Sequence, residues 1–443
     1  MRQERGVDDI FTPRYLRVLL WILLFAAAAE FVVRGPVRFL RDPTNWNDLS
    51  QNYTASKLWL QGQNPSKPEN FVALWKHEGR SRLDTHDVRT HTAQPPGTFV
   101  ILAPIAAFSW PVAKVLWLGV LLVAFAMTVW SLLQVAGFRG DTSRTLAFIT
   151  GCLALAPFHT GFSGGNATIL VVGACAVAIW AADSRRDILA GLLFGVACSL
   201  KPQIGSFLVL YYLLNRRWRL FATALALTAV LALTAILWLR VSGVSWADDY
   251  FHNIKSMATE NKIDDFTSAN PIRFMLINLQ VPVYSFTRSA RSANIVALSA
   301  GAFLVMAWSY LIIKGRAHES ELLSLGTIAV ICLMPVYHRL YDASLLAIPL
   351  GWCLSWPTGK LKNVSRVVFL LLVPFLVPGT ALLQQLSGQG RVPVGWTSSW
   401  WWDRVVMPHQ TWVLLLLCFA LLYGMSLDTP ARPMKWEQRN SKA

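Results

Sequence analysis

Long apolar runs, each bounded by charged residues or proline, constrain this chain more than any other feature. The runs are roughly 15–25 residues long, about the length of a helix that crosses the hydrocarbon core of a bilayer. Overall, 54% of the residues are hydrophobic and 14% are charged, about half the charged share of a soluble domain. The pattern therefore predicts an all-α integral membrane protein, and it excludes a soluble globule and a disordered chain.

The runs predict one polytopic membrane domain over about residues 1–430, followed by a short tail at 431–443. Polar stretches at about 34–94, 241–292 and 384–410 interrupt the domain, and their length and aromatic content predict functional loops. Arginines precede the first apolar run, and the tail is basic. We therefore expect both ends in the cytoplasm and the three long loops on the outer side.

The formal net charge of +16 does not predict nucleic-acid binding. Lysines and arginines gather in short turns beside apolar runs, where they set membrane orientation and meet anionic lipid headgroups. The six cysteines lie inside apolar runs without a CxxC pair, which predicts buried thiols and not disulfides or a metal site. No Walker A, GxGxxG or DxD pattern is present, so we expect neither a nucleotide cofactor nor a metal.

One ionisable residue, Lys201, stands inside otherwise apolar sequence. The Lys201-Pro202 break separates two short apolar runs, and such a break is tolerated where the backbone is buried in protein or lines a cavity. Burying an unpaired lysine costs at least roughly 2.5 kcal/mol, so a lysine here is a functional candidate. We interpret Lys201 as a phosphate ligand, and snorkelling to the interface is the alternative.

Asp48 is the most informative carboxylate, and it lies in the stretch at 45–65. A helical run follows it, so an N-cap is one interpretation. The other is a general base near the outer membrane face. Possible hydrogen-bond donors around this carboxylate are Asn47, Gln51, Tyr53 and Lys57.

Three further polar clusters interrupt apolar sequence. Gln94 precedes the pair Pro95-Pro96, and Asn166 follows a pair of glycines. Helix initiation and a tight turn are the alternatives for these two clusters.

The third cluster is the turn at 338–342, which places three ionisable residues between two apolar runs. Arg339 could contact a phosphate bidentately, and His338 could bind a phosphate oxygen or move a proton. Asp342 could orient either of them. An ordinary charged loop is the alternative.

Taken together, these stretches resemble glycosyltransferase family 87, which is related to mycobacterial polyprenol-phosphate-mannose-dependent mannosyltransferases. The resemblance covers about residues 15–425. It rests on DLSQNYTASKLWLQGQNP from Asp48, the paired prolines, Gly165-Asn166, Lys201-Pro202 and the His-Arg-x-Tyr-Asp turn at 338–342.

The resemblance implies a GT-C fold of about 12 transmembrane helices, some of them short and broken, in the plasma or inner membrane. It implies inverting transfer of a sugar, with mannose favoured, from polyprenyl phosphate to a glycolipid or glycan acceptor on the extracytoplasmic face. Asp48 would be the general base, and Lys201, His338 and Arg339 would hold the donor phosphate. The remaining substrate contacts would come from Asn47, Gln51, Tyr53, Lys57, Gln94, Asn166 and Asp342.

Two other classes of protein fit parts of the pattern. A secondary transporter would also have broken helices and an intramembrane lysine, but it usually shows internal symmetry and short loops. A lipid-linked oligosaccharide polymerase or ligase also carries a large outer loop, but an aspartate in the first outer loop is not typical of it. The long loops at uneven positions favour the glycosyltransferase.

Overall fold

The computed structural model describes residues 14–42, 47–78, 90, 92–138, 140–257, 264–314, 320–355 and 357–427. Within these ranges the secondary structure is helical, apart from one isolated antiparallel bridge between Leu276 and Arg339. The all-α prediction is therefore confirmed for the described part of the chain. The expected tail at 431–443 and the basic N-terminal residues before Arg14 lie outside the described residues.

The helices follow the apolar runs of the sequence closely, and the long polar stretches contain short helices of their own. In chain order the elements are α1 (Arg14–Val32), η2 (Val33–Val37), α2 (Arg38–Arg41), α3 (Asp48–Leu60), α4 (Pro68–His77), α5 (Pro96–Ala106), α6 (Trp110–Val135), α7 (Thr142–Ala154), α8 (Ala156–Ser163), α9 (Thr168–Asp183), α10 (Asp187–Leu200), α11 (Pro202–Leu214), α12 (Trp218–Val241), α13 (Ala247–Met257), η4 (Arg273–Met275), α14 (Gln280–Thr287), α15 (Ala290–Ile313), α16 (Glu321–Ile331), η5 (Leu340–Leu346), α17 (Ala347–Leu354), α18 (Leu361–Leu372), η6 (Val373–Leu376), α19 (Gly379–Gly388), α20 (Val394–Thr397), η7 (Trp402–Val406) and α21 (His409–Leu427).

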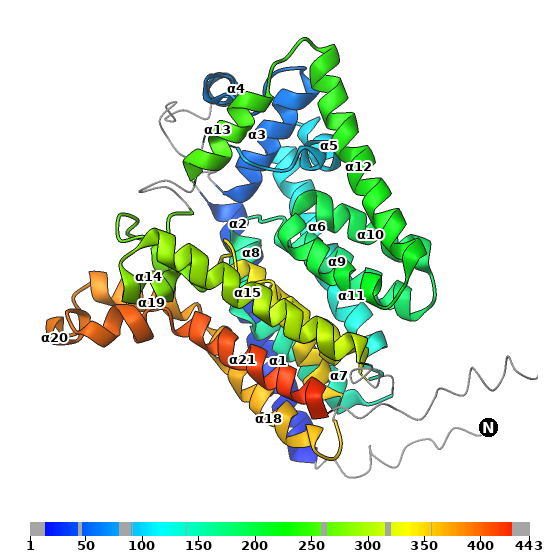
Figure 1. The fold of residues 1–443 in the computed structure, drawn as a ribbon, viewed down its shortest axis with the longest axis vertical. Helices are drawn as coiled ribbons and strands as arrows, with labels where there is room; N and C mark the ends of the chain where they lie inside the picture. Colours follow the sequence, from blue (N-terminus) through cyan, green and yellow to red (C-terminus); the bar gives the residue numbers. More distant parts are fainter. Residues whose placement is uncertain are drawn as a thin grey trace, which may run out of the picture.

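The elements form two parts that meet near the middle of the molecule (Figure 1). Helices α3, α4, α5 and α13 lie at one end beside α12, and α1, α7, α18 and α21 lie at the other end. Helix α8 lies between the two parts and packs against both η2 and η5. This junction brings together segments that are far apart in the sequence.

Among the described residues, six helices are long and apolar enough to cross a membrane, and the bent pair α7–α8 would add a seventh if it counts as one span. The six are Arg17–Arg41, α6, α12, α15, Leu361–Gly388 and α21. Other apolar helices, such as α9, α10 and α11, are shorter than a full crossing requires. The chain is thus a multi-pass membrane protein, and its described part has six or seven helices of spanning length where we expected about 12.

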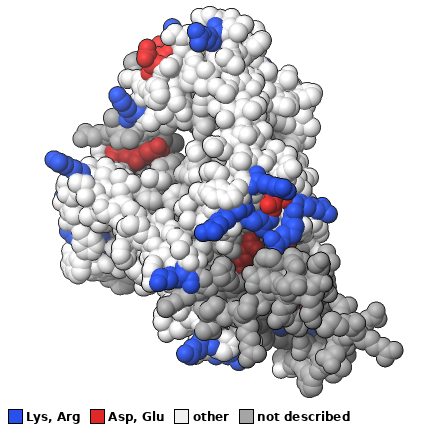
Figure 2. All heavy atoms as spheres, turned by 45° about the vertical axis from the view of Figure 1, so that its right-hand side comes forward, with Lys and Arg blue, Asp and Glu red and all other residues white. Residues whose placement is uncertain are grey.

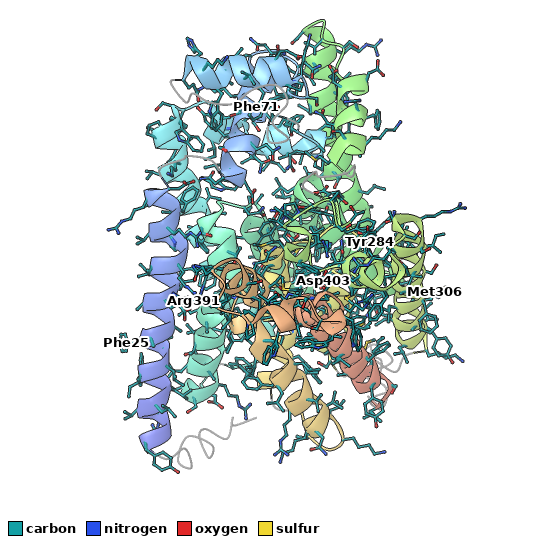
Figure 3. All side chains as sticks on the ribbon, turned by 90° about the vertical axis from the view of Figure 1, so that its left-hand side faces the viewer. Phe25, Phe71, Tyr284, Met306, Arg391 and Asp403 are labelled. Atoms are coloured by element: carbon teal, nitrogen blue, oxygen red, sulfur yellow. The ribbon has the colours of Figure 1, made fainter. Side chains whose placement is uncertain are left out.

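The outer surface of the long helices is apolar. Figure 2 shows wide areas without charged side chains between a few groups of lysines and arginines. Phe25 on α1 and Met306 on α15 point away from the molecule (Figure 3), and they are 69% and 62% exposed. Such a surface suits contact with lipid, because a soluble monomer rarely exposes apolar patches of this extent.

The first helix does not end where the polar sequence begins. We expected a loop from residue 34, but η2 and α2 continue the helix to Arg41. Pro36 lies within the π-helical turn η2, and the missing N–H of a proline is tolerated in such a locally widened turn. Gly35 brings this turn close to α8, since a Cβ at Gly35 would lie 3.0 Å from Cβ of Phe162.

The turn after α8 is packed from two sides. Gly165 has a φ of +59°, and the indole N–H of Trp117 donates to its carbonyl oxygen at 2.8 Å. Phe39 of α2 is fully buried, and a Cβ at Gly165 would lie 2.5 Å from Phe39 Cε2. Both the backbone conformation and the space therefore require glycine at this position.

We expect Gly165→Ala to lower the melting temperature of the purified protein in detergent more than Gly137→Ala does. Gly137 also has a positive φ, +72°, but nothing lies within 4 Å of its Cβ position. Left-handed backbone strain alone costs about 1–2 kcal/mol, and the contact with Phe39 adds to this cost at Gly165. Equal losses for the two variants would contradict the tight packing of the turn.

Candidate active site

Asp48 is the first residue of α3, and the glycine turn fixes its position. Its N–H donates to the Gly164 carbonyl at 2.9 Å, and the side-chain amide of Asn166 donates to Asp48 Oδ2 at 2.6 Å. The N-cap of α3 is Asn47, which exchanges a reciprocal pair of hydrogen bonds with Ser50. The N-cap interpretation of Asp48 is therefore wrong, since Asn47 caps the helix and Asp48 is its first residue.

A hydrogen-bond network continues from Asn166 to Asp342. The Thr168 N–H donates to Asn166 Oδ1 at 2.8 Å, and the Thr168 hydroxyl lies 2.7 Å from that oxygen and 2.6 Å from Asp342 Oδ1. Lys201 Nζ lies 2.6 Å from Asp342 Oδ1, and His338 Nδ1 lies 3.0 Å from Asp342 Oδ2. Residues predicted from separate stretches of sequence thus meet at one carboxylate.

Lys201 is ion-paired inside the protein and is not snorkelling to an interface. It caps the end of α10, and Pro202 begins α11, so the break leaves its side chain directed toward the Asp342 carboxylate. The Lys201 side chain is 13% exposed, and its ammonium lies 4.7 Å from the centre of the Tyr341 ring. Because Asp342 is fully buried, this pairing accounts for both charges.

Asp48 also lines a cavity of about 830 Å³. A cavity of this volume holds a ligand of small-molecule size. Its walls come from η2, α2, the start of α3, the end of α8 and the turn at 338–342. The lining residues are Val33, Arg34, Val37, Arg38, Arg41, Asp42, Asn47, Asp48, Thr160, Ser163, Gly164 and Tyr341.

Arg339 joins the turn at 338–342 to the second long loop through its backbone bridge with Leu276. Burial lowers the pKa of the Arg339 guanidinium, but Tyr337 and Tyr341, followed by Asp48 and Asp264, raise that pKa above its ordinary value. The guanidinium thus stays charged, within the electrostatic field of Asp48.

The sequence alone did not single out Asp264, which is one of two adjacent acidic residues in the second long loop. Burial raises the pKa of Asp264 to about 7, and the charges of Arg339 and Lys201 oppose this increase. The neighbouring Asp265 instead accepts a local hydrogen bond from the Thr267 N–H at 2.7 Å. No local sequence signal separates the two aspartates, because only the fold brings Asp264 toward the turn at 338–342.

The other predicted substrate contacts do not all lie in the cavity wall. Asn47 lines the cavity beside Asp48. Neither Gln51 nor Gln94 is among the described residues that form the cavity wall. Both glutamines are partly buried.

Tyr53 and Lys57 contact a separate polar group. Lys57 Nζ lies 2.8 Å from Glu78 Oε1 and 2.7 Å from the Tyr53 hydroxyl. That hydroxyl also donates to the Phe108 carbonyl at 2.9 Å. Tyr53 and Lys57 therefore tie α3 to the segments after α4 and α5.

All six cysteines are free thiols, five of them buried, which confirms the prediction that they form no disulfide framework. Among the described residues there is no group of three or more histidines, cysteines or carboxylates that could hold a metal ion. The described residues of the cavity wall present carboxylates, arginines and hydroxyl groups.

We expect Lys201→Met to lower the free energy of unfolding by about 3–5 kcal/mol, because it leaves the buried Asp342 carboxylate without its cationic partner. The double variant Lys201→Met/Asp342→Asn should recover part of this loss. Thermal unfolding in detergent measures both effects. A melting temperature unchanged by Lys201→Met would contradict a structural ion pair.

The stability of the protein should also depend on pH through Asp264. Its pKa of about 7 in the folded protein exceeds the unfolded value of about 3.9, so the folded state binds this proton more tightly. The stabilisation is full below about pH 4 and is lost as the pH rises to about 7, by at most about 4 kcal/mol.

The variant Asp264→Asn removes the titrating group and should flatten this slope, whereas Asp265→Asn should retain it. Melting temperatures measured between about pH 4 and pH 8 compare the three proteins. Identical pH profiles for wild type and Asp264→Asn would contradict the assignment.

The chain matches a known protein family over more than half of its length. The family model described as "Glycosyltransferase family 87" matches residues 93–340, which contain Asn166, Lys201, His338 and Arg339. Asp48 precedes the matched region and reaches it only through the fold.

The chain is also 27% identical over 153 residues to the alpha-(1->3)-arabinofuranosyltransferase of two Mycobacterium tuberculosis strains, CDC 1551 / Oshkosh and ATCC 25618 / H37Rv. This similarity covers 34% of the chain and 35% of each relative, so it spans about a third of their length. No solved structure matches the chain.

Proposed function

Because the chain belongs to glycosyltransferase family 87, we propose that it transfers a sugar from a polyprenyl-phosphate-linked donor to a glycolipid or glycan acceptor. Transfer takes place on the extracytoplasmic face of the plasma membrane, inverts the anomeric carbon and uses Asp48 as general base. Membership in this family favours a glycosyltransferase over the secondary transporter and over the oligosaccharide polymerase or ligase.

The position of Asp48 in the cavity wall is the observation that carries this proposal. Asp48 Oδ2 accepts a hydrogen bond from Asn166. The described residues provide no hydrogen-bond partner for Asp48 Oδ1. One oxygen is thus oriented by the protein, and the other can take a proton from an acceptor hydroxyl.

The proposed reaction is a single displacement. Asp48 accepts the proton of an acceptor hydroxyl while the hydroxyl oxygen attacks the anomeric carbon of the donor. The bond between that carbon and the phosphate oxygen breaks, the oxygen keeps the bonding electrons, and polyprenyl phosphate leaves. Attack on the face opposite the leaving group inverts the configuration. The leaving phosphate gains negative charge, which nearby cationic donors stabilise.

Arg339 supplies positive charge near Asp48 in this proposal, because the two groups interact electrostatically across the site. The assignment of Lys201 and His338 to the donor phosphate stays a prediction. Their contacts with Asp342 support a positioning role, since Asp342 leads through Thr168 and Asn166 to the general base. Such a supporting shell keeps a catalytic carboxylate within the narrow range of productive orientations.

The sugar is proposed on two kinds of similarity. The family resemblance favours mannose, whereas the curated relatives are named arabinofuranosyltransferases. Polyprenyl-phosphate mannose and polyprenyl-phosphate arabinofuranose are therefore the two donors to compare, each with a membrane extract as the source of acceptor.

We expect Asp48→Asn to reduce transfer by about 10²–10⁴-fold, because asparagine cannot accept the proton. Asparagine is nearly the same size and can still accept the hydrogen bond from Asn166, so the melting temperature should stay close to that of the wild type. Transfer is measured as labelled sugar incorporated into the acceptor. The exposed Asp248 at the start of α13 gives the matched control Asp248→Asn, which should leave transfer unchanged.

Retention of transfer in Asp48→Asn would refute the general-base role. A parallel loss of melting temperature and transfer would instead assign Asp48 a structural role.

A further inference from the structure

A row of three arginines lines the cavity beside Asp48. Arg34, Arg38 and Arg41 follow one another at spacings of four and three residues, which place them on one face of the η2–α2 helix. All three residues are exposed. Neither the sequence-based prediction nor the proposed reaction assigns them a role.

Membrane orientation does not account for these arginines. Basic residues that orient a span gather at its cytoplasmic end, and the sequence before the first span already supplies Arg2, Arg5 and Arg14. The row lies at the opposite end of the span Arg17–Arg41. A second basic cluster at that end therefore calls for another explanation.

The helical segment beneath the row is firmly held. Phe39, between Arg38 and Arg41, is fully buried, and its ring centre lies 5.4 Å from Lys114 Nζ. The same Nζ donates to the Leu40 carbonyl at 3.2 Å. The arginine side chains thus project from a backbone whose position is fixed by packing.

The described wall of the cavity carries both arginines and aspartates. Arg34 pairs with Glu30 at 2.6 Å, whereas Arg38 and Arg41 form no ion pair with another described residue. The acidic residues of the wall are Asp42 and Asp48. Because Glu30 pairs with Arg34, Arg38 and Arg41 are the two arginines of the described wall with which an anionic ligand can pair.

We propose that Arg38 and Arg41 bind the phosphate group of the lipid-linked donor. This assignment rests on the proposed function and gives it a phosphate site in the cavity. The phosphodiester of such a donor carries one negative charge, and its oxygens match the planar fork of a guanidinium. A phosphate held by these arginines shares the cavity with Asp48, so the attached sugar can reach the general base.

The same segment offers a path for the lipid chain. Val33 and Val37 line the cavity next to the arginines, and Val33 is 62% exposed. Exposed apolar side chains, including Val32 and Phe25, continue from there along α1, which forms one edge of the molecule in Figure 3. A polyprenyl chain lying against α1 stays in hydrocarbon while its phosphate reaches the arginines.

The test uses the full chain in lipid nanodiscs and the variant Arg38→Gln/Arg41→Gln. The KM for the polyprenyl-phosphate sugar should rise at least about tenfold, because each arginine contributes a charge-assisted hydrogen bond. The change in kcat should be smaller. Arg38→Lys/Arg41→Lys should recover only part of the loss, since an ammonium keeps the charge but lacks the fork. The control is Arg240→Gln at the exposed end of α12, which should match the wild type.

Direct binding distinguishes the sources of the phosphate. Native mass spectrometry compares polyprenyl phosphate, polyprenol of the same length and phosphatidylglycerol as probes. The wild type should prefer polyprenyl phosphate to polyprenol, and the double glutamine variant should lose this preference while its melting temperature stays unchanged.

The proposal fails if the double glutamine variant keeps both the wild-type preference for polyprenyl phosphate over polyprenol and the wild-type KM for the donor. Loss of phosphatidylglycerol binding with an unchanged donor KM would overturn it as well, because the arginines would then hold a membrane lipid. If the wild type transfers neither sugar but its preference for polyprenyl phosphate depends on the arginines, the proposed function fails and the phosphate site stands.

Discussion

The buried carboxylate of Asp342 is the interaction on which the rest of this arrangement depends. A fully buried carboxylate in an apolar bundle is unfavourable unless cations and hydrogen-bond donors surround it. Asp342 receives them from Lys201, His338 and Thr168. These donors come from the α10–α11 break, the turn before η5 and the start of α9, so one carboxylate fixes three segments of the bundle.

The general base proposed for the reaction is positioned by an extension of this network. Asn166 connects Thr168 to Asp48, and the Asp48 N–H is bound by the glycine turn. Phe39 of α2 packs against this glycine turn. The same packing therefore sets the orientation of the proposed base and the position of the arginine row that shares its cavity.

The short apolar helices gain a physical explanation from this arrangement. A helix break inside a membrane leaves backbone groups without partners, which is tolerated only within protein or next to a cavity. At Lys201-Pro202 the lysine side chain is largely buried beside Asp342, Pro202 is exposed, and α10 packs against α9 and α12. The break is thus compatible with a bundle that has fewer full-length spans than apolar segments.

The sequence by itself determined the helical membrane class, the positions of the apolar helices and several candidate site residues, because hydrophobic periodicity and helix breaks are local properties. Only the tertiary structure decided which polar groups meet. Lys201 and Asp342 are 141 residues apart in sequence, and Asn166 and Asp48 are 118 apart. For the same reason the structure, and not the sequence, assigned Lys57 to Glu78, distinguished Asp264 from Asp265 and placed the arginines beside Asp48. Pairing between buried polar groups depends on long-range packing, which no local pattern encodes.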